Sequence, residues 1–176
     1  VVDGDGDAVA LTSSIENAFG SRLMVRGFLL NNQLTDFAFS PLDDDGPVAN
    51  RAAPGKRPRS SMSPTLVVDG AGKLVLSLGS PGGSSIIGYV AKTIISALDW
   101  DMDIQAAIDL PHFINRNGAT DLEKDTSIGA LKSDLEAAGH QARERRMTSG
   151  LHAIRVRGGA LAGAADRRRE GVALGD

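Results

Sequence analysis

The sequence contains no cysteine, which excludes disulfide bonds, thiolate metal sites and a cysteine nucleophile. Aromatic residues make up only 4% of it and its formal charge is −3, so neither a base-stacking platform nor a phosphate-binding surface is expected. No apolar run approaches the roughly 20 residues that span a membrane, and no signal-peptide pattern is present. Nucleic-acid binding and membrane insertion therefore do not explain this chain.

Metal binding is also not expected. The three histidines, His112, His140 and His152, fall in separate predicted elements without the spacing of metal ligands. Residues 3–7 begin like a calcium loop, but Ala8 stands where such a loop needs glycine. We predict a simple turn there.

The composition is that of a folded protein. Hydrophobic residues make up 41% and charged residues 23% of the 176 residues, which is enough for one domain with its own core. We see no internal boundary and predict a single domain over residues 1–176. The arginine clusters at residues 143–146 and 167–169 are most simply solvated charge.

The hydrophobic pattern predicts strands first, then helices, then strands. Strands are predicted over residues 8–15, 23–30, 65–68, 74–78 and, on both sides of a Gly-Gly turn, 153–165. Helices are predicted over residues 86–98 (capped by Ser84 or Ser85), 104–110 and 128–138. Residues 41–58, rich in proline and aspartate, read as a loop. The order predicts an α+β fold, with helices on one face of a mostly antiparallel sheet.

Three polar segments are not explained by core packing. Residues 79–84 read GSPGGS, and paired glycines before a helix leave backbone N–H groups uncovered at its positive end. Such a turn suits an oxyanion hole or an anion cradle, although a plain strand-to-helix turn has the same pattern. Residues 56–61 read KRPRSS, and the hydroxyls of Ser60 and Ser61 could donate hydrogen bonds to a carboxylate. The alternative is that this segment is an ordinary solvated loop.

The third segment, residues 31–37, reads NNQLTDF. A carboxylate at its end could bind an ammonium group, and the alternative is a turn in which the side chains bond their own backbone. Upstream, Ser14 and Glu16 lie at the end of the first predicted strand. Without a functional role, Ser14 would be an ordinary polar strand residue and Glu16 a surface charge.

In their chain order (residues 31–37, 56–61 and 79–84), the three segments resemble the small subunit of a γ-glutamyltranspeptidase, an N-terminal-nucleophile (Ntn) hydrolase. The resemblance covers the whole chain and implies half of an αββα sandwich, completed by the large subunit of the same precursor. In family members the small subunit begins with a threonine nucleophile in a Thr-x-His-x-Ser stretch just before the Val-Val-Asp that opens this chain, so the nucleophile is expected outside it. Asp166 and Arg168 match a final stretch of the family and are given a structural role.

The resemblance also implies the site. Gly82 and Gly83 would form the oxyanion hole, and Ser14 would contact the nucleophile. The substrate would be held by these side chains: Glu16, Gln33 and Asp36 at the α-ammonium, and Ser60 and Ser61 at the α-carboxylate. Family members usually have an apolar residue where this chain has Arg59, which affects local polarity. Residues 41–58 would form a short, incomplete lid.

The implied activity is γ-glutamyl transfer and hydrolysis on glutathione and γ-glutamyl amides, without metal or cofactor. The implied partners are the large subunit and this small-molecule substrate, and the implied location is periplasmic or secreted. Three alternatives stay open: a cephalosporin or glutaryl acylase of the same fold, a non-catalytic family member that acts as a binding module, or a plain structural α+β domain. The last does not explain three polar segments in family order. The two acidic residues, Glu16 and Asp36, argue against the acylase.

Overall fold

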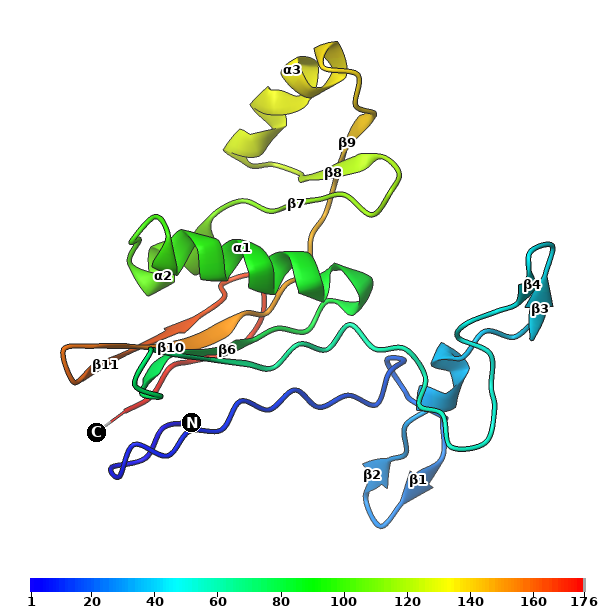
Figure 1. Cartoon of the computed structure of the whole chain (residues 1–176), viewed down its shortest axis with the longest axis horizontal. Coiled ribbons are helices and arrows are strands. Elements are labelled where there is room, and N and C mark those ends of the chain that lie inside the picture. The colour runs from blue at the N-terminus through cyan, green and yellow to red at the C-terminus, as the bar shows by residue number, and fades with distance from the viewer. Residues whose placement is uncertain (176) are drawn as a thin grey trace. The chain divides into compact units, whose positions relative to one another are not determined.

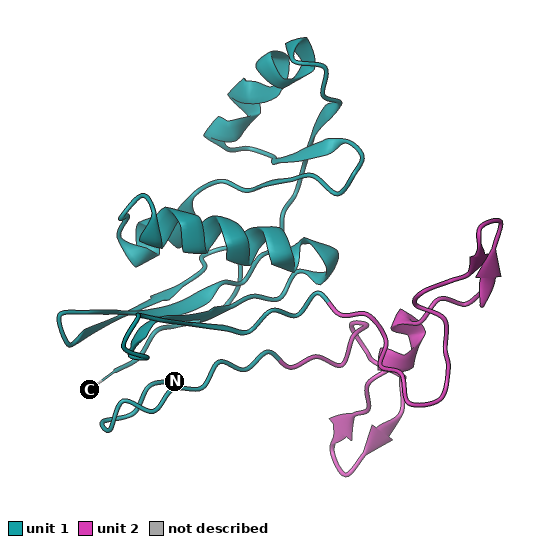
Figure 2. Ribbon diagram, in the orientation of Figure 1, with its two compact units in different colours: residues 1–12, 61–176 teal, residues 13–60 magenta. Residues whose placement is uncertain are grey.

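The computed structural model describes residues 1–175, which form two compact units. The first unit contains residues 1–12 and the chain from Ser61 onward, and the second contains residues 13–60 (Figure 2). Each unit is described by itself.

A four-stranded sheet forms the centre of the first unit (Figure 1). Its strands are β5 (Thr65–Val68), β6 (Leu74–Gly79), β10 (His152–Arg157) and β11 (Ala160–Ala165), in the order β11-β10-β6-β5. Every neighbouring pair is antiparallel. The turn between β5 and β6 is held by Asp69, whose carboxylate accepts from the Ala71 and Lys73 amides, both at 2.9 Å. These strands confirm the predicted ones.

Two helices cover one face of this sheet. They are α1 (Ile86–Leu98) and α2 (Ile104–Asp109), and Figure 1 shows α1 lying over the strands. The core between the layers contains these buried side chains: Leu76, Leu78, Ala153 and Ala164 from the strands, and Ile86, Tyr89, Val90, Ala97, Ile104, Ala107 and Ile108 from the helices. The apolar periodicity that predicted α1 is therefore its core face.

The predicted serine cap of α1 is wrong in its contacts. No side-chain hydrogen bond caps the helix, because α1 continues directly from a 3-10 turn, η2 (Gly83–Ser85). Ser85 already has helical backbone angles and is buried. The cap of α2, by contrast, is a side chain: Asp103 accepts from the Ala106 amide at 3.0 Å.

The opposite face of the sheet is apolar and partly exposed. Register places Leu66 and Leu161 on the side away from α1 and α2, because they pair with positions that are out of phase with the buried Leu76 and Leu78. These two side chains are 46% and 54% exposed. One layer of helices thus leaves apolar side chains exposed on the opposite face of the sheet.

Three further strands were not predicted. They are β7 (Phe113–Ile114), β8 (Thr120–Glu123) and β9 (Ala142–Arg145), with β8 and β9 parallel. The helix predicted over residues 128–138 is divided into η3 (Ser127–Leu131) and α3 (Lys132–Ala137). Its predicted end is confirmed, since Gly139 has a φ of 90° and its amide donates to Glu136 O at 3.0 Å.

The strand predicted over residues 8–15 is wrong. Ala8 forms only an isolated bridge with Val2. The predicted turn before it is present, because the Asp3 carboxylate accepts from the Asp5 and Asp7 amides at 3.1 and 2.9 Å.

The second unit consists of short hairpins around a 3-10 turn. Its elements are β1 (Met24–Val25), β2 (Phe28–Leu29), η1 (Gln33–Asp36), β3 (Leu42–Asp43) and β4 (Gly46–Pro47). The buried strand predicted over residues 23–30 is wrong: Arg26 and Gly27 turn the chain with positive φ, and Met24 and Phe28 are more than 60% exposed. Within residues 1–175 no helix is long and apolar enough to cross a membrane.

Candidate active site

The most distinctive turn of the first unit follows β6. Residues 80–83, here called the glycine turn, connect the strand to η2 and α1. Gly82 has a φ of 136° and Gly83 a φ of 57°, values that suit glycine. Among the described residues, neither amide donates a hydrogen bond. Two consecutive N–H groups at the start of a helix are therefore available to an anion.

Tyr89 supports the glycine turn from the helix. A Cβ atom added to Gly82 would lie 2.6 Å from Cε2 of Tyr89, so the ring packs directly against the glycine. Tyr89 is 1% exposed, and its ring centroid lies 4.3 Å from that of His112. Any side chain at position 82 would displace this ring.

A second contact comes from the loop before β10. The Gly150 amide donates to Ser80 Oγ at 3.2 Å, and Ser80 Oγ donates to Pro81 O at 2.7 Å. A Cβ atom on Gly150 would be 2.8 Å from Cγ of Pro81, so the Gly150 backbone packs closely on the Pro81 ring. The glycine turn is thus held on two sides.

Beneath it lies a buried polar network. His112 Nε2 is 2.8 Å from Ser149 Oγ, and Ser149 Oγ donates to Asp166 Oδ2 at 2.5 Å. Arg168 binds Asp166 Oδ1 at 3.1 Å and forms a two-pronged ion pair with Glu123 at 2.5 and 2.9 Å. The same guanidinium donates to the carbonyls of Ile108 and Leu110 at the end of α2. The charge pattern suggested that Arg168 is solvated, but these contacts show that it is paired inside the protein. The structural role given to Arg168 fits these contacts.

The network determines the charge state of its members. Burial alone would raise the pKa of Asp166, but hydrogen bonds from Ser149, Arg168 and Leu151 and the Arg168 charge hold it below the ordinary value. Burial, followed by the charges of Lys92 and Arg168, lowers the pKa of His112 to about 3. Asp166 is thus ionised and His112 neutral near neutral pH.

In the second unit, Asn32 joins two of the predicted substrate segments. Its side-chain amide donates to Glu16 at 2.6 Å and to Thr35 at 2.9 Å, and its oxygen accepts from the Asn17 amide at 3.0 Å. Ser14 Oγ accepts from the Glu16 amide at 2.7 Å. Ser14, Glu16 and residues 31–36 therefore lie together, although they are distant in sequence.

Gln33 and Asp36 lie at the two ends of η1 and are connected through their side chains. Gln33 Nε2 donates to Asp36 Oδ2. The Asp36 carbonyl accepts from Asn50 Nδ2 at 2.7 Å, and Asn50 Oδ1 accepts from the Arg59 amide at 2.9 Å. Asn50 thus ties the acidic segment to the residues that lead into Ser60 and Ser61.

The predicted site residues are divided between the units. Ser14, Glu16, Gln33, Asp36 and Ser60 belong to the second unit, and Ser61, Gly82 and Gly83 belong to the first. Ser61 is half-buried and its carbonyl accepts from Ser63 Oγ at 2.9 Å, while Ser60 is exposed. Sequence reasoning missed Asn32 and Asn50, which connect the segments. The NN pair before Gln33 was a usable signal for Asn32, but nothing in the sequence singles out Asn50.

Comparison with known proteins identifies the family. The family described as Gamma-glutamyltranspeptidase matches residues 1–176. The chain belongs to the γ-glutamyltranspeptidase family. It is 39% identical to the glutathione hydrolase proenzyme of Escherichia coli (strain K12), over 96% of this chain and 30% of the relative. It is 35% identical to that of Bacillus subtilis (strain 168), over 99% of this chain and 30% of the relative. The chain therefore spans about 30% of the length of these curated relatives.

Solved structures agree on the fold. A γ-glutamyltranspeptidase from Pseudomonas nitroreducens complexed with L-DON superposes with a TM-score of 0.88 at 31% identity, covering 100% of this chain and 97% of that one. The T380A mutant of the Helicobacter pylori enzyme gives 0.85 at 34% identity, covering 96% and 97%. The predicted α+β class and Ntn-hydrolase fold are confirmed. A cephalosporin acylase from Bacillus halodurans, at 23% identity and a TM-score of 0.76 over 88% of this chain and 29% of that one, shares the fold alone.

Proposed function

We propose that the protein containing this chain transfers and hydrolyses γ-glutamyl groups, acting on glutathione and γ-glutamyl amides. The observation that carries this proposal is the pair of carboxylates Glu16 and Asp36. They are held in one small unit by the amides of Asn32 and Gln33. An α-ammonium is the substrate group that two such carboxylates suit, and it separates γ-glutamyl from glutaryl substrates.

The first unit would stabilise the negative charge that develops on the substrate oxygen during the reaction. Attack on the γ-carbonyl turns its oxygen into an oxyanion, and the amides of Gly82 and Gly83 are the free donors at the start of α1. Ser60 and Ser61 would bind the α-carboxylate. Ser14 would contact the nucleophile, and this role stays a proposal drawn from the family.

The proposed mechanism is a two-step acyl transfer. A threonine N-terminal to Val1, activated by its own amine, would attack the γ-carbonyl and expel the amine of the donor, which takes up a proton. Water or an acceptor amine then attacks the acyl-enzyme and releases glutamate or a γ-glutamyl amide, which restores the threonine. This chemistry needs no metal and no cofactor.

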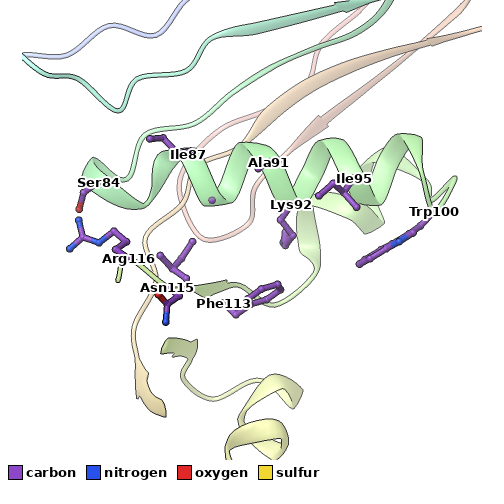
Figure 3. Close-up of a pocket in the computed structure, with 11 residues that line it drawn as sticks. Ser84, Ile87, Ala91, Lys92, Ile95, Trp100, Phe113, Asn115 and Arg116 are labelled. Atoms are coloured by element: carbon purple, nitrogen blue, oxygen red, sulfur yellow. The ribbon is translucent and has the colours of Figure 1, made fainter. Parts of the chain in front are cut away.

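The uncovered apolar surface suits a partner of the same precursor. Relatives named as proenzymes extend well beyond the length of this chain. A groove of about 620 Å³ lies beside α1 and is lined by Ile87, Ile95, Trp100 and Phe113 among others, as Figure 3 shows for its side chains. We propose that a large subunit covers this groove and the free face of the central sheet, that the chain forms one domain of that assembly, and that the assembly is periplasmic or secreted.

A direct test compares two donors on the full-length protein. γ-Glutamyl-p-nitroanilide and glutaryl-p-nitroanilide differ only in the α-ammonium, because both carry the carboxylate. The proposal expects turnover of the first and a strong preference for it over the second. Preference for the glutaryl compound would favour an acylase, and turnover of neither would favour a non-catalytic family member.

A further inference from the structure

We propose that His112, Ser149 and Asp166 form a buried positioning network that fixes the Gly82–Gly83 amides in the orientation needed to bind the oxyanion. This inference rests on the proposed function, because it assigns a support to the proposed oxyanion hole. Its members do not touch the substrate, since each is at most 1% exposed.

Hydrogen-bond chemistry fixes the direction of the network. Asp166 is an acceptor and already receives the amides of Leu151 at 3.2 Å and Arg168 at 2.9 Å. The single Ser149 proton is directed to Asp166 over 2.5 Å. His112 Nε2 must therefore carry a proton and donate to Ser149 Oγ over 2.8 Å. The unprotonated Nδ1 is buried and has no hydrogen-bond partner among residues 1–175.

This order excludes a catalytic triad. In a serine nucleophile's triad the imidazole accepts the serine proton and the carboxylate orients the imidazole. Here the carboxylate takes the serine proton, and Ser149 is 0% exposed. The three side chains thus form a fixed bridge between separate elements of the first unit.

The bridge reaches the glycine turn by two routes. Ser149 precedes Gly150, whose amide donates to Ser80 Oγ and whose backbone packs on Pro81. His112 stacks on Tyr89, whose ring packs on Gly82. One route sets the start of the turn and the other sets its end, so a shift in the bridge would tilt both amides.

The far end of the bridge is rigid. Arg168 binds Asp166, Glu123 and carbonyls at the end of α2, and Glu123 Oε2 also accepts from the His112 amide at 2.8 Å. Charge-assisted hydrogen bonds on several sides of Asp166 and Arg168 thus hold this end of the bridge in one geometry. Small displacements of the donors weaken oxyanion stabilisation, so a displacement of this network should lower kcat.

The test compares two buried serines in the full-length protein. Ser149→Ala removes the hydroxyl of the bridge. Ser96→Ala removes an equally buried hydroxyl from α1, one that donates only to Lys92 O at 2.8 Å. Steady-state kinetics with γ-glutamyl-p-nitroanilide and inhibition by a γ-glutamyl boronate analogue, which mimics the tetrahedral intermediate, are measured for matured protein.

We expect Ser149→Ala to lower kcat by roughly 10- to 100-fold with little change in KM, and to weaken boronate binding in parallel. Ser96→Ala should leave all three near wild type. His112→Gln, which keeps a donor toward Ser149, should retain more kcat than His112→Ala, and this pair also decides the matter if Ser149→Ala does not fold.

Equal effects of Ser149→Ala and Ser96→Ala, or a loss confined to KM, would overturn the network while leaving the proposed function intact. The same applies if His112→Gln and His112→Ala lose kcat equally. Wild-type protein without any γ-glutamyl turnover would instead overturn the proposed function and the network with it.

Discussion

Replacing Asp36 by alanine should separate substrate recognition from folding. Its side chain is half-buried and bonds to Gln33 Nε2, while its backbone carbonyl is held independently by Asn50. The substitution therefore removes a carboxylate from the proposed ammonium site and leaves the backbone contact of η1 in place. The substitution should therefore weaken substrate binding and leave the stability of the fold nearly unchanged.

The magnitude follows from an ammonium that loses one charged partner. Such a loss costs about 2–4 kcal/mol when the pair is desolvated. Asp36 is partly exposed and Glu16 remains as a second carboxylate, so we expect the lower end, about 2 kcal/mol. That corresponds to a rise of roughly 30-fold in KM for γ-glutamyl-p-nitroanilide, at about 1.4 kcal/mol per tenfold.

The assay compares KM for the γ-glutamyl and glutaryl anilides, because the glutaryl compound has no ammonium to lose. Asp44→Ala, in the turn between β3 and β4, is the matched control and should change neither value. If Asp36→Ala raised KM equally for both substrates, or for neither, the assignment of Asp36 to the ammonium would be refuted.

Three further predictions concern the other parts of the site. Gly82→Ala should lower kcat by roughly 10²- to 10³-fold, because the new Cβ meets the Tyr89 ring and the positive φ is strained. Gly83→Ala has open space around its Cβ and should lose less kcat. Equal losses of kcat in the two variants would contradict the role of the ring. The folded pKa of His112 lies below its unfolded value, so the stability that its neutral form gives is present above about pH 6.5 and is lost as the pH falls toward about 3. Denaturant unfolding should therefore show a loss of roughly 1.5–2 kcal/mol between about pH 6.5 and about pH 5 that is absent in His112→Gln, and an equal slope in both proteins would contradict the buried neutral imidazole. Deleting residues 42–47, whose flanks are already joined by the Val48 amide and Pro41 O, should change the ratio of hydrolysis to transfer and leave the KM ratio of the two donors unchanged; an unchanged ratio of hydrolysis to transfer would mean that this hairpin is no lid.

Local sequence signals predicted the central sheet and its helices well. The Asp-Gly turn after β5 and the Gly-Gly turn after β10 fix hairpins within a few residues, and α1 has a clear apolar face. The parallel pair β8 and β9 was missed because its strands carry charges that are neutralised only in the folded chain, as Asp121 is by Arg143 and Arg145.

The site was predicted only in part, for a similar reason. The glycine turn and the acidic segment have recognisable residue types in short windows. The links from Asn32 to Glu16 and from Asn50 to Asp36, and the bridge from His112 to Asp166, join residues far apart in sequence. Periodicity describes one element at a time, so it carries no information on such contacts.

The central claim is that the protein carries γ-glutamyl groups covalently. Its most direct test is the intact mass of full-length, matured protein quenched during turnover of a γ-glutamyl donor. The account predicts a gain of one γ-glutamyl group per molecule, strongly reduced by Asp36→Ala at low donor concentration. Turnover without a covalent adduct under any quench, or equal labelling by glutaryl and γ-glutamyl donors, would contradict it.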